Sequence, residues 1–178
     1  MSNPWDERAE LYRTSVTHST GDDLDAVVEL CNPHAGVKVL DVATGGGHVA
    51  RRLQEQGAEV VTLDPSPGMR ADVVAPAEDI PFADGSFDVA VSRIAAHHFA
   101  DLGRAFGELV RVSSRVVVIE DMLYRTEEEQ EGGEAARSDA SPLALDRGME
   151  RAVYVGRRRH VGERLRRPQG QKVSELVA

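Results

Sequence analysis

Short apolar runs alternate along the chain with segments in which apolar residues recur every three or four positions. The runs have the length of buried strands, and they lie at 37–40, 60–63, 87–91 and 115–120. The segments between them have the spacing of amphipathic helices. This alternation predicts an α/β fold in which helices cover a doubly wound, mostly parallel sheet.

Helices are expected at Trp5–Tyr12 and in a segment that Asp22 or Asp23 caps and that ends before Pro33. The apolar face of this second helix is Leu24, Val27, Val28 and Cys31. A third helix follows the glycines at 45–47. In a fourth, the residues predicted to face inward are Leu102, Ala105, Phe106, Leu109 and Val110.

Two segments depart from a regular doubly wound sheet. Only Pro65–Asp72 separates the second strand from the next apolar stretch, Val73–Ala75. Because a parallel crossover usually needs a dozen residues or more, we expect a shortened edge-strand crossover. After Tyr124 the apolar periodicity ends, so the chain is divided into a core, 1–122, and a charged tail of low order, 123–178.

A tail without strands would leave the sheet without a final β-hairpin. The apolar face of the fifth strand, Val116 and Val118, would then be partly uncovered. Exposed sheet edges pair readily with other chains, so self-association through this edge is expected, with impaired activity.

Composition narrows the class of protein. The 178 residues suit one domain, and 41% hydrophobic content is enough for one core. A net charge of −9 argues against a general nucleic-acid binder. The chain shows no signal peptide and no run long enough to span a membrane, which predicts a cytoplasmic protein. Cys31 is the single cysteine and is expected in the core, and no metal site is predicted.

The chemistry is concentrated around three consecutive glycines, Gly45–Gly47. The strand before them ends in Asp41, and the next strand ends in Asp64, close to the roughly 20 residues at which an acid hydrogen-bonds a ribose hydroxyl. Glycines let a ligand approach bare backbone, and the following helix N-terminus favours a polar or anionic group. We therefore expect a pocket for a nucleotide-like cofactor at the carboxyl end of the first strand.

Five stretches in order resemble the class I S-adenosylmethionine-dependent methyltransferases, in the group with the ubiquinone and menaquinone C-methyltransferases. They are ERAELYRTSVTH, LDVATGGGHVA, VVTLDPSPGM, AEDIPFADGSFDVAVSR, and HHFADLGRAFGELVRV followed by VVVIED. The resemblance covers about Trp5–Tyr124 and implies a Rossmann-like fold, S-adenosylmethionine as methyl donor and a small-molecule acceptor, which it does not specify.

The resemblance also implies roles for individual residues. The glycine turn would hold the methionine and ribose end of the donor, Asp64 would accept the ribose hydroxyls, and Asp79 with the backbone near Ile80 would face the adenine. The donor-binding residues predicted in this way are Tyr12, Asp41, Ala43, Thr44, Gly45, Gly47, Asp64, Pro65, Asp79, Ile80 and Arg93. Catalysis would rest mainly on holding donor and acceptor in line. If the acceptor must lose a proton, His97 and His98 are the candidate bases, with a loop or capping role as the alternative.

Two other functions remain open. Gly45, Gly47 and Ala50 formally satisfy G-x-G-x-x-G/A, so an NAD-dependent oxidoreductase is the first alternative. Against it, the first strand ends in Asp41 before the turn. The second alternative is a non-catalytic remnant that keeps part of the cofactor site.

A reading-frame shift near Gly132 is a second explanation for the tail. Read from the second base of each codon, Glu134–Ala140 can encode KLRDPTH and Leu145–Arg157 can encode STEEWSARFTSAG. Both segments look like the part of the methyltransferase family that follows the fifth strand. Stop codons in that offset frame between Glu131 and Gly156 would exclude the shift.

Overall fold

A six-stranded sheet with helices on both faces forms the protein. The computed structural model describes residues 4–122 and 151–157. The strands are β1 (Lys38–Val42), β2 (Glu59–Asp64), β3 (Val73–Val74), β4 (Phe87–Arg93), β5 (Ser113–Met122) and β6 (Arg151–Arg157). The helices are α1 (Pro4–Thr14), α2 (Val16–Ser19), α3 (Asp22–Cys31), α4 (His48–Glu55) and α5 (Leu102–Val112), with 3₁₀ turns η1 (Pro67–Met69) and η2 (Ala96–His98).

The sheet is doubly wound, as the sequence predicts. The strand order is β3-β2-β1-β4-β5-β6, and β1 to β5 are all parallel. The chain leaves β1 for β2 on one side and returns to β4 on the other. Such a reversal opens a crevice at the carboxyl ends of the strands, where ligands bind in open α/β sheets.

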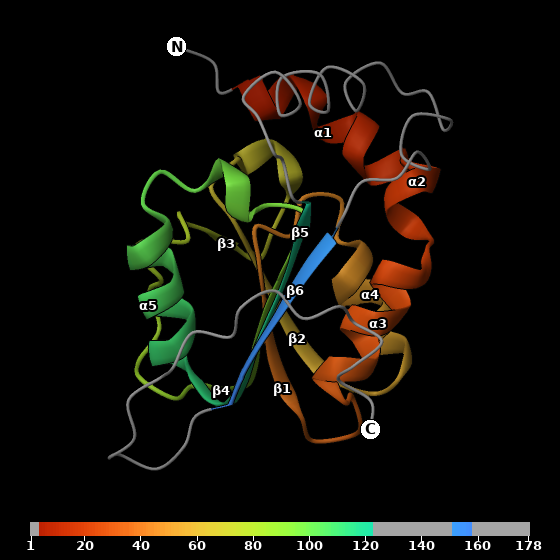
Figure 1. The fold of residues 1–178 in the computed structure, drawn as a ribbon. Helices are drawn as coiled ribbons and strands as arrows, with labels where there is room; N and C mark the ends of the chain where they lie inside the picture. The colour runs from red at the N-terminus through yellow and green to blue at the C-terminus, as the bar shows by residue number, and fades with distance from the viewer. Residues whose placement is uncertain (1–3, 123–150, 158–178) are drawn as a thin grey trace.

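Alternation along the strands divides the core into two layers (Figure 1). Side chains of α3 and α4 pack with Val39, Val89 and Val118 on one face of the sheet. Side chains of α5 pack with Leu40, Ala90 and their neighbours on the other face. Successive strand residues point to opposite faces, so Asp41 lies on the same face as Val39.

The helix predictions hold in outline and fail in two details. Helix α3 begins at Asp22 after Gly21, which is its N-cap, so neither aspartate caps it. In α5, Leu102 and Val110 are exposed, and the buried residues are Ala105, Leu109 and Val112. Helix α5 therefore presents a narrower apolar stripe to the sheet than the sequence pattern indicated.

The crossover between β2 and β3 is short, as predicted. It contains only the 3₁₀ turn η1 where a longer helix would stand, and Leu63 pairs with Val73 directly after it. The Asp72 carboxylate accepts hydrogen bonds from the amide and hydroxyl of Thr62, which stabilises the return of the chain.

The prediction that no strand follows Tyr124 is wrong at residues 151–157. Strand β6 runs antiparallel to β5 and pairs with it from Val116 to Met122 (Figure 1). The edge of β5 is thus occupied, which removes the basis for self-association there. Val118 is fully buried and Val116 partly buried under α3, so their face is covered as well. The remainder of the tail lies outside the described residues, and the structure does not test the frame shift.

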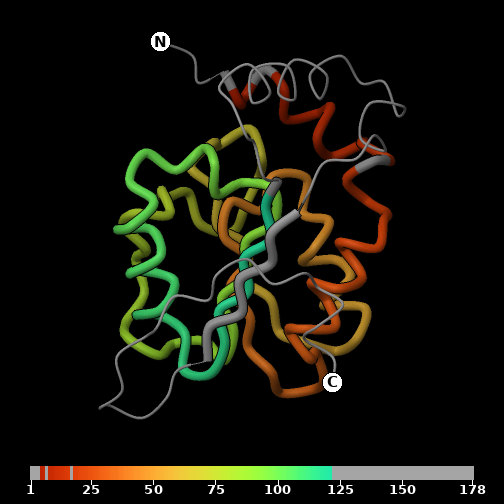
Figure 2. The backbone as a smooth tube through the Cα atoms, in the orientation of Figure 1, coloured from red at the N-terminus to blue at the C-terminus, as the bar shows by residue number. Residues whose placement is uncertain are grey.

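Helix α1 lies across the carboxyl ends of the strands (Figures 1 and 2). It contacts η1, which follows β2, and forms a roof over the crevice. No helix among the described residues is long and apolar enough to cross a membrane.

Candidate functional site

Two adjacent cavities lie at the carboxyl ends of β1, β2 and β4. The larger has a volume of about 200 Å³ and the smaller about 50 Å³. Four residues line both: Tyr12 from α1, Ala43 and Gly45 from the turn after β1, and Ile94 after β4. The two cavities therefore meet where the N-terminal helix crosses the glycine turn.

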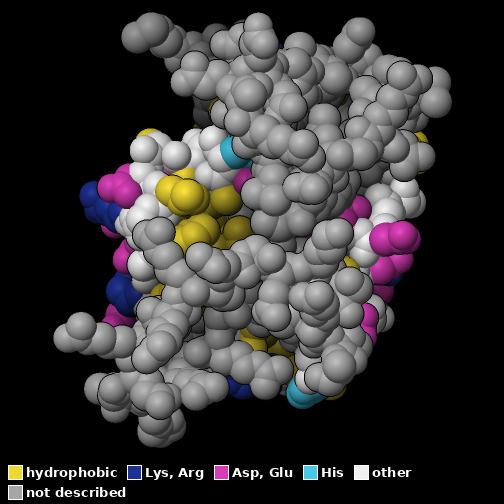
Figure 3. Space-filling model, in the orientation of Figure 1, with side chains coloured by type: hydrophobic (Ala, Val, Ile, Leu, Met, Phe, Trp, Pro, Cys, Tyr) yellow, Lys and Arg dark blue, Asp and Glu magenta, His cyan; other side chains and the backbone are white. Residues whose placement is uncertain are grey.

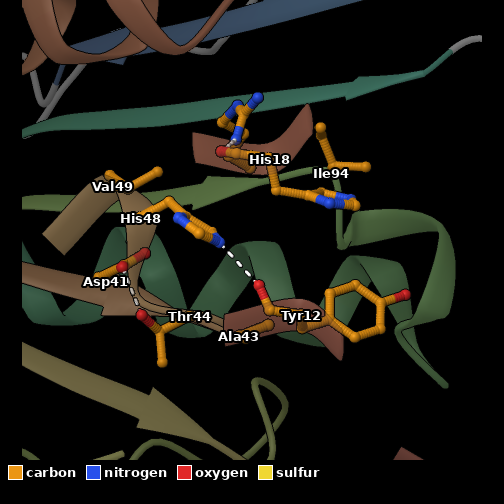
Figure 4. A pocket seen from close by; sticks show the side chains of 10 residues that line it. Tyr12, His18, Asp41, Ala43, Thr44, His48, Val49 and Ile94 are labelled. Atoms are coloured by element: carbon orange, nitrogen blue, oxygen red, sulfur yellow. Dashed lines mark hydrogen bonds between the residues drawn. The ribbon is translucent and has the colours of Figure 1, made fainter. Parts of the chain in front are cut away.

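Asp41 is the acidic group of the smaller cavity (Figure 4). Its carboxylate accepts a hydrogen bond from the Thr44 hydroxyl at 2.6 Å, and the residue is 2% exposed. Burial raises the pKa of Asp41 to about 7, although the bond from Thr44 opposes the shift. A cationic ligand in this cavity would favour the ionised form of Asp41.

Asp64 is held on the wall of the larger cavity by two backbone amides. One carboxylate oxygen accepts from the Gly45 amide at 3.0 Å and the other from the Ser66 amide at 2.9 Å. Burial raises the pKa of Asp64, and the two amides oppose this shift. Each oxygen retains a lone pair, so the carboxylate can accept two further hydrogen bonds from a diol.

The backbone around the cavities includes left-handed conformations. Gly45 has φ +52°, Ala43 has φ +55° and Ile94 has φ +53°. Such values cost nothing for glycine but are strained for alanine and unusual for a β-branched residue. The strain at Ala43 and Ile94 coincides with the cavity walls, as is common at functional sites.

Two contacts fasten α1 to the turn after β2. The Asp6 carboxylate accepts hydrogen bonds from the Ser66 hydroxyl and, at 2.8 Å, from the Gly68 amide. A Cβ atom at Gly68 would lie 2.8 Å from the Asp6 Cα, so glycine is required for this approach. The Arg13 guanidinium also donates to the Gly68 carbonyl.

A third contact fastens α1 to the glycine turn. Nε2 of His48 lies 2.8 Å from the Tyr12 carbonyl oxygen (Figure 4), and Nδ1 of His48 lies 2.6 Å from an Arg51 nitrogen. A Cβ atom at Gly46 would meet the Tyr12 oxygen at 2.4 Å. Gly46 is therefore required for the roof itself, whereas the sequence analysis attributed all three glycines to ligand access.

Arg93 lines the smaller cavity, but other groups hold its guanidinium. It donates to Asp23 of α3 at 2.7 Å and to the His18 carbonyl at 2.8 Å, and it lies 4.0 Å from the fully buried Glu120. Nearby carboxylates thus neutralise its charge. Arg93 lies at the end of β4 and lines the same cavity as Asp41. Its bonds to Asp23 and to the His18 carbonyl favour a role in closing the site.

His97 and His98 stand at the end of β4 with different surroundings. The amide and Nδ1 of His97 each lie 2.7 Å from the Asp121 carboxylate, at the end of β5. The His98 ring contacts the rings of both His97 and Trp5, with centroids 3.8 Å and 4.6 Å away. His98 lines the larger cavity, whereas His97 does not.

Asp79 and Ile80 line neither cavity. Asp79 is exposed, and the Ile80 side chain is buried in the α5 layer. The Ile80 amide donates to Glu108 and its carbonyl accepts from Arg111, so the backbone at 80 is bound to α5. Glu78, the residue before Asp79, lines the larger cavity.

The remaining predicted residues lie at the cavities or beside them. Those that line a cavity are Tyr12, Asp41, Ala43, Thr44, Gly45, Asp64, Pro65 and Arg93. Gly47 is the N-cap of α4, with φ +72°, and lines neither. The lining residues that the sequence reasoning missed include Trp5, His48, Val49, Met69, Pro76, Ala77, Ala95, Phe99 and Ala100. Of these, Pro76 and Ala77 lie in the loop before Ile80, a segment that the sequence had marked. Ala77 lies two positions before Asp79, the residue predicted there.

On the side of α5 that Figure 3 shows, basic side chains lie among acidic ones and form no basic patch. No cluster of potential metal ligands occurs within the described ranges.

Comparison with known proteins identifies the domain type. Residues 40–115 match the family model described as a methyltransferase domain. The uncharacterized methyltransferase YcgJ of Bacillus subtilis is 31% identical over 125 residues, which cover 61% of this chain and 49% of that protein. The demethylmenaquinone methyltransferase of Thermus thermophilus is 38% identical over 112 residues, which cover 52% of this chain and 51% of that protein. The core of this chain is thus similar to S-adenosylmethionine-dependent methyltransferase domains.

Solved structures agree on the fold of this core. The crystal structure of YcgJ matches with a TM-score of 0.53 at 25% identity, covering 63% of this chain and 55% of that one. A SAM-dependent methyltransferase from Aquifex aeolicus matches in fold, with a TM-score of 0.57 at 20% identity, covering 76% of this chain and 87% of that one. The chain spans about half the length of the two curated relatives described above.

Proposed function

We propose that this protein binds S-adenosylmethionine across the two adjacent cavities and transfers its methyl group to a small-molecule acceptor. The position of Asp64 is the observation that supports this most directly. Its carboxylate lies on the wall of the larger cavity, at the end of β2, and accepts a hydrogen bond from the Gly45 amide. A ribose diol donates two hydrogen bonds, and this fixed carboxylate can accept both.

The charges of the site fit a cationic donor. Asp41, Asp64 and Glu78 are the acidic residues on the cavity walls, and the guanidinium of Arg93 is engaged by Asp23. When bound, the donor supplies an activated methyl group on a sulfonium. The chain's own residues then have three tasks: to hold the donor's sugar at Asp64, to place its charged end near Asp41, and to exclude water beneath α1.

The alternatives predict different binding. The methyltransferase relatives and family model give no support to an NAD-dependent oxidoreductase. A non-catalytic remnant would bind the donor without turnover. We also propose that the protein acts in the cytoplasm, in keeping with the absence of a spanning helix among the described residues.

Calorimetric titration of the full chain with S-adenosylmethionine and, separately, with NAD tests the proposal. We expect micromolar binding of the donor, no binding of NAD, and at least a tenfold loss of donor affinity in Asp64→Ala. The matched control is Asp25→Ala. Asp25 is an exposed acid that pairs with Arg52 and lines neither cavity, so this variant should bind the donor with normal affinity. Binding of NAD in preference to S-adenosylmethionine would overturn the assignment.

A further inference from the structure

The turn after β4 carries two neighbouring histidine rings, one of which lines the larger cavity. Asp121, from β5, is bonded to both the amide and Nδ1 of His97. The rings of His97 and His98 are in contact at a tilt of 51°, and the Trp5 ring of α1 also contacts His98, at a tilt of 57°. Of the two histidines, His98 alone lines the cavity.

Asp121 holds His97, and the rings of His97 and Trp5 contact His98. Because a carboxylate only accepts hydrogen bonds, the His97 ring donates from Nδ1 to Asp121 and its orientation is set. Contact with the His97 ring in turn limits where the His98 ring can lie. Two contacts from different elements, α1 and β5, thereby keep one imidazole at the cavity wall.

The titratable groups around His98 differ in charge and distance. His97 is in direct ring contact, Asp121 lies behind His97, and Glu78 lines the same cavity. Asp121 places a carboxylate 2.7 Å from Nδ1 of His97. His98 is also exposed, so a proton taken from a ligand can pass to solvent.

We propose that His98 is the proton acceptor of the methyl-transfer reaction, that His97 and Asp121 position it, and that the acceptor is a phenolic compound. The proposal rests on the proposed function. A phenol is flat and apolar, and the wall near His98 contains Trp5 and Phe99. Its hydroxyl is a weak nucleophile until it loses a proton, and a base with a pKa near neutrality suits that task.

The step balances without any further reactant. The phenol O–H bond breaks and the proton goes to the His98 ring. The oxygen forms a bond to the methyl carbon as the carbon–sulfur bond breaks, and the electron pair of that bond goes to the sulfur. The products are a methyl ether, the neutral thioether S-adenosylhomocysteine and a protonated His98, which returns its proton to water.

Turnover of a panel of phenols and of the corresponding anilines, followed as S-adenosylhomocysteine formation, tests the proposal on the full chain. For the wild type we expect turnover of one or more phenols. In His98→Gln we expect kcat/KM for the phenol to fall by about 100-fold or more, the usual contribution of general-base catalysis, and to fall far more than the donor affinity does. His34→Gln is the matched control, since His34 is exposed and lies before β1, and it should behave as wild type.

Two further variants separate proton transfer from a structural role. Activity of His98→Ala should be restored in part by added imidazole, because the vacated position opens to solvent. Asp121→Asn should lower kcat/KM about tenfold and move the acidic limb of its pH profile to lower pH, because the carboxylate charge behind His97 is lost. Failure of imidazole to restore activity, together with an unchanged pH profile in Asp121→Asn, would contradict the proposal.

The remaining outcomes distinguish this proposal from the proposed function. Donor binding with turnover of anilines alone, or with equal turnover of phenols by wild type and His98→Gln, overturns the role of His98 and leaves methyl transfer standing. Donor binding without turnover of any phenol also overturns it. Absence of donor binding overturns the proposed function itself, and this proposal with it.

Discussion

The imidazole of His48 donates its Nε2–H to the backbone carbonyl of Tyr12 across 2.8 Å. The carbonyl can only accept, so Nε2 carries the proton, and Nδ1 accepts from Arg51 at 2.6 Å. The ring is therefore neutral and in a single tautomer. This one side chain joins the helix after the glycine turn to the helix that roofs the cavities.

The joint requires the absence of a side chain at Gly46. In Gly46→Ala, the new Cβ would stand 2.4 Å from the Tyr12 oxygen and 2.6 Å from Nε2 of His48, so α1 would have to move. We expect donor affinity to fall at least tenfold and the free energy of unfolding to fall by about 1–3 kcal/mol, typical of overpacking. Calorimetry and urea unfolding measure the two effects.

Gly107→Ala is the matched control for Gly46→Ala. Gly107 lies in α5, and nothing stands within 4 Å of an added Cβ. Because alanine favours the helix, this change should stabilise the protein by about 0.5–1 kcal/mol with unchanged donor affinity. Normal donor binding by Gly46→Ala would show that α1 does not form the roof.

The roof should also weaken in acid through His48. Burial lowers the pKa of His48 below its ordinary value near 6.5. At pH values between the folded and the ordinary pKa, the unfolded chain binds more protons than the folded chain. Stability therefore falls as the pH falls through this window, by at most about 1.4 kcal/mol per pH unit. His48→Gln keeps an N–H donor but does not titrate. Urea unfolding at pH 7.5 and 5.5 should show a smaller loss for this variant, and an equal loss would assign the effect to other groups.

Ala43 is strained where its backbone passes between the two cavities. Its φ of +55° costs an L-residue about 1–2 kcal/mol, and glycine adopts it freely. After the larger entropy of glycine in the unfolded chain is subtracted, Ala43→Gly should raise the free energy of unfolding by about 0.5–1 kcal/mol. Ala83→Gly, at an exposed position outside the set of positive-φ residues, should lower it by a similar amount. Destabilisation by both changes would argue against strain at Ala43.

The order of elements and the edge of the sheet that carries the site were predictable from local pattern. Buried parallel strands are nearly continuous apolar runs, and the acids Asp41 and Asp64 end two of them. Parallel strands bring their carboxyl ends to one edge, which placed both acids together. The short crossover at η1 was predictable as well, since chain length alone limits what can fit there.

The contacts that close the site were not predictable in this way, because they join residues far apart in the sequence. Gly68 and Asp6 are 62 residues apart, and nothing near Gly68 signals that a helix approaches it. The sequence predicted that Asp79 faces the adenine, whereas Glu78, the residue before it, lines the cavity. Neighbouring acids in a loop look alike in sequence, and the bonds from Glu108 and Arg111 to the backbone at Ile80 decide which one reaches the cavity. Strand β6 has too little alternation for its pairing with β5 to be read locally.

Asp41 should release a proton when the donor binds. Burial raises its pKa to about 7, so at pH 6.5 most of the free protein carries a protonated Asp41. A cationic donor in the smaller cavity stabilises the carboxylate and lowers this pKa, which expels the proton. Titrations at pH 6.5 in buffers of different ionisation enthalpy should therefore show release of somewhat less than one proton per donor bound, falling toward zero at pH 8. Asp41→Asn, which retains an acceptor for Thr44, should abolish the release. The raised pKa of Asp41 also affects folding. The unfolded chain loses this proton near pH 4, whereas the folded chain keeps it up to about pH 7. The contribution of Asp41 to stability therefore falls as the pH rises from about 4 to 7 and is constant above. The difference in unfolding free energy between Asp41→Asn and the wild type should follow that course. Equal proton release by the two proteins would place the cationic end of the donor away from Asp41.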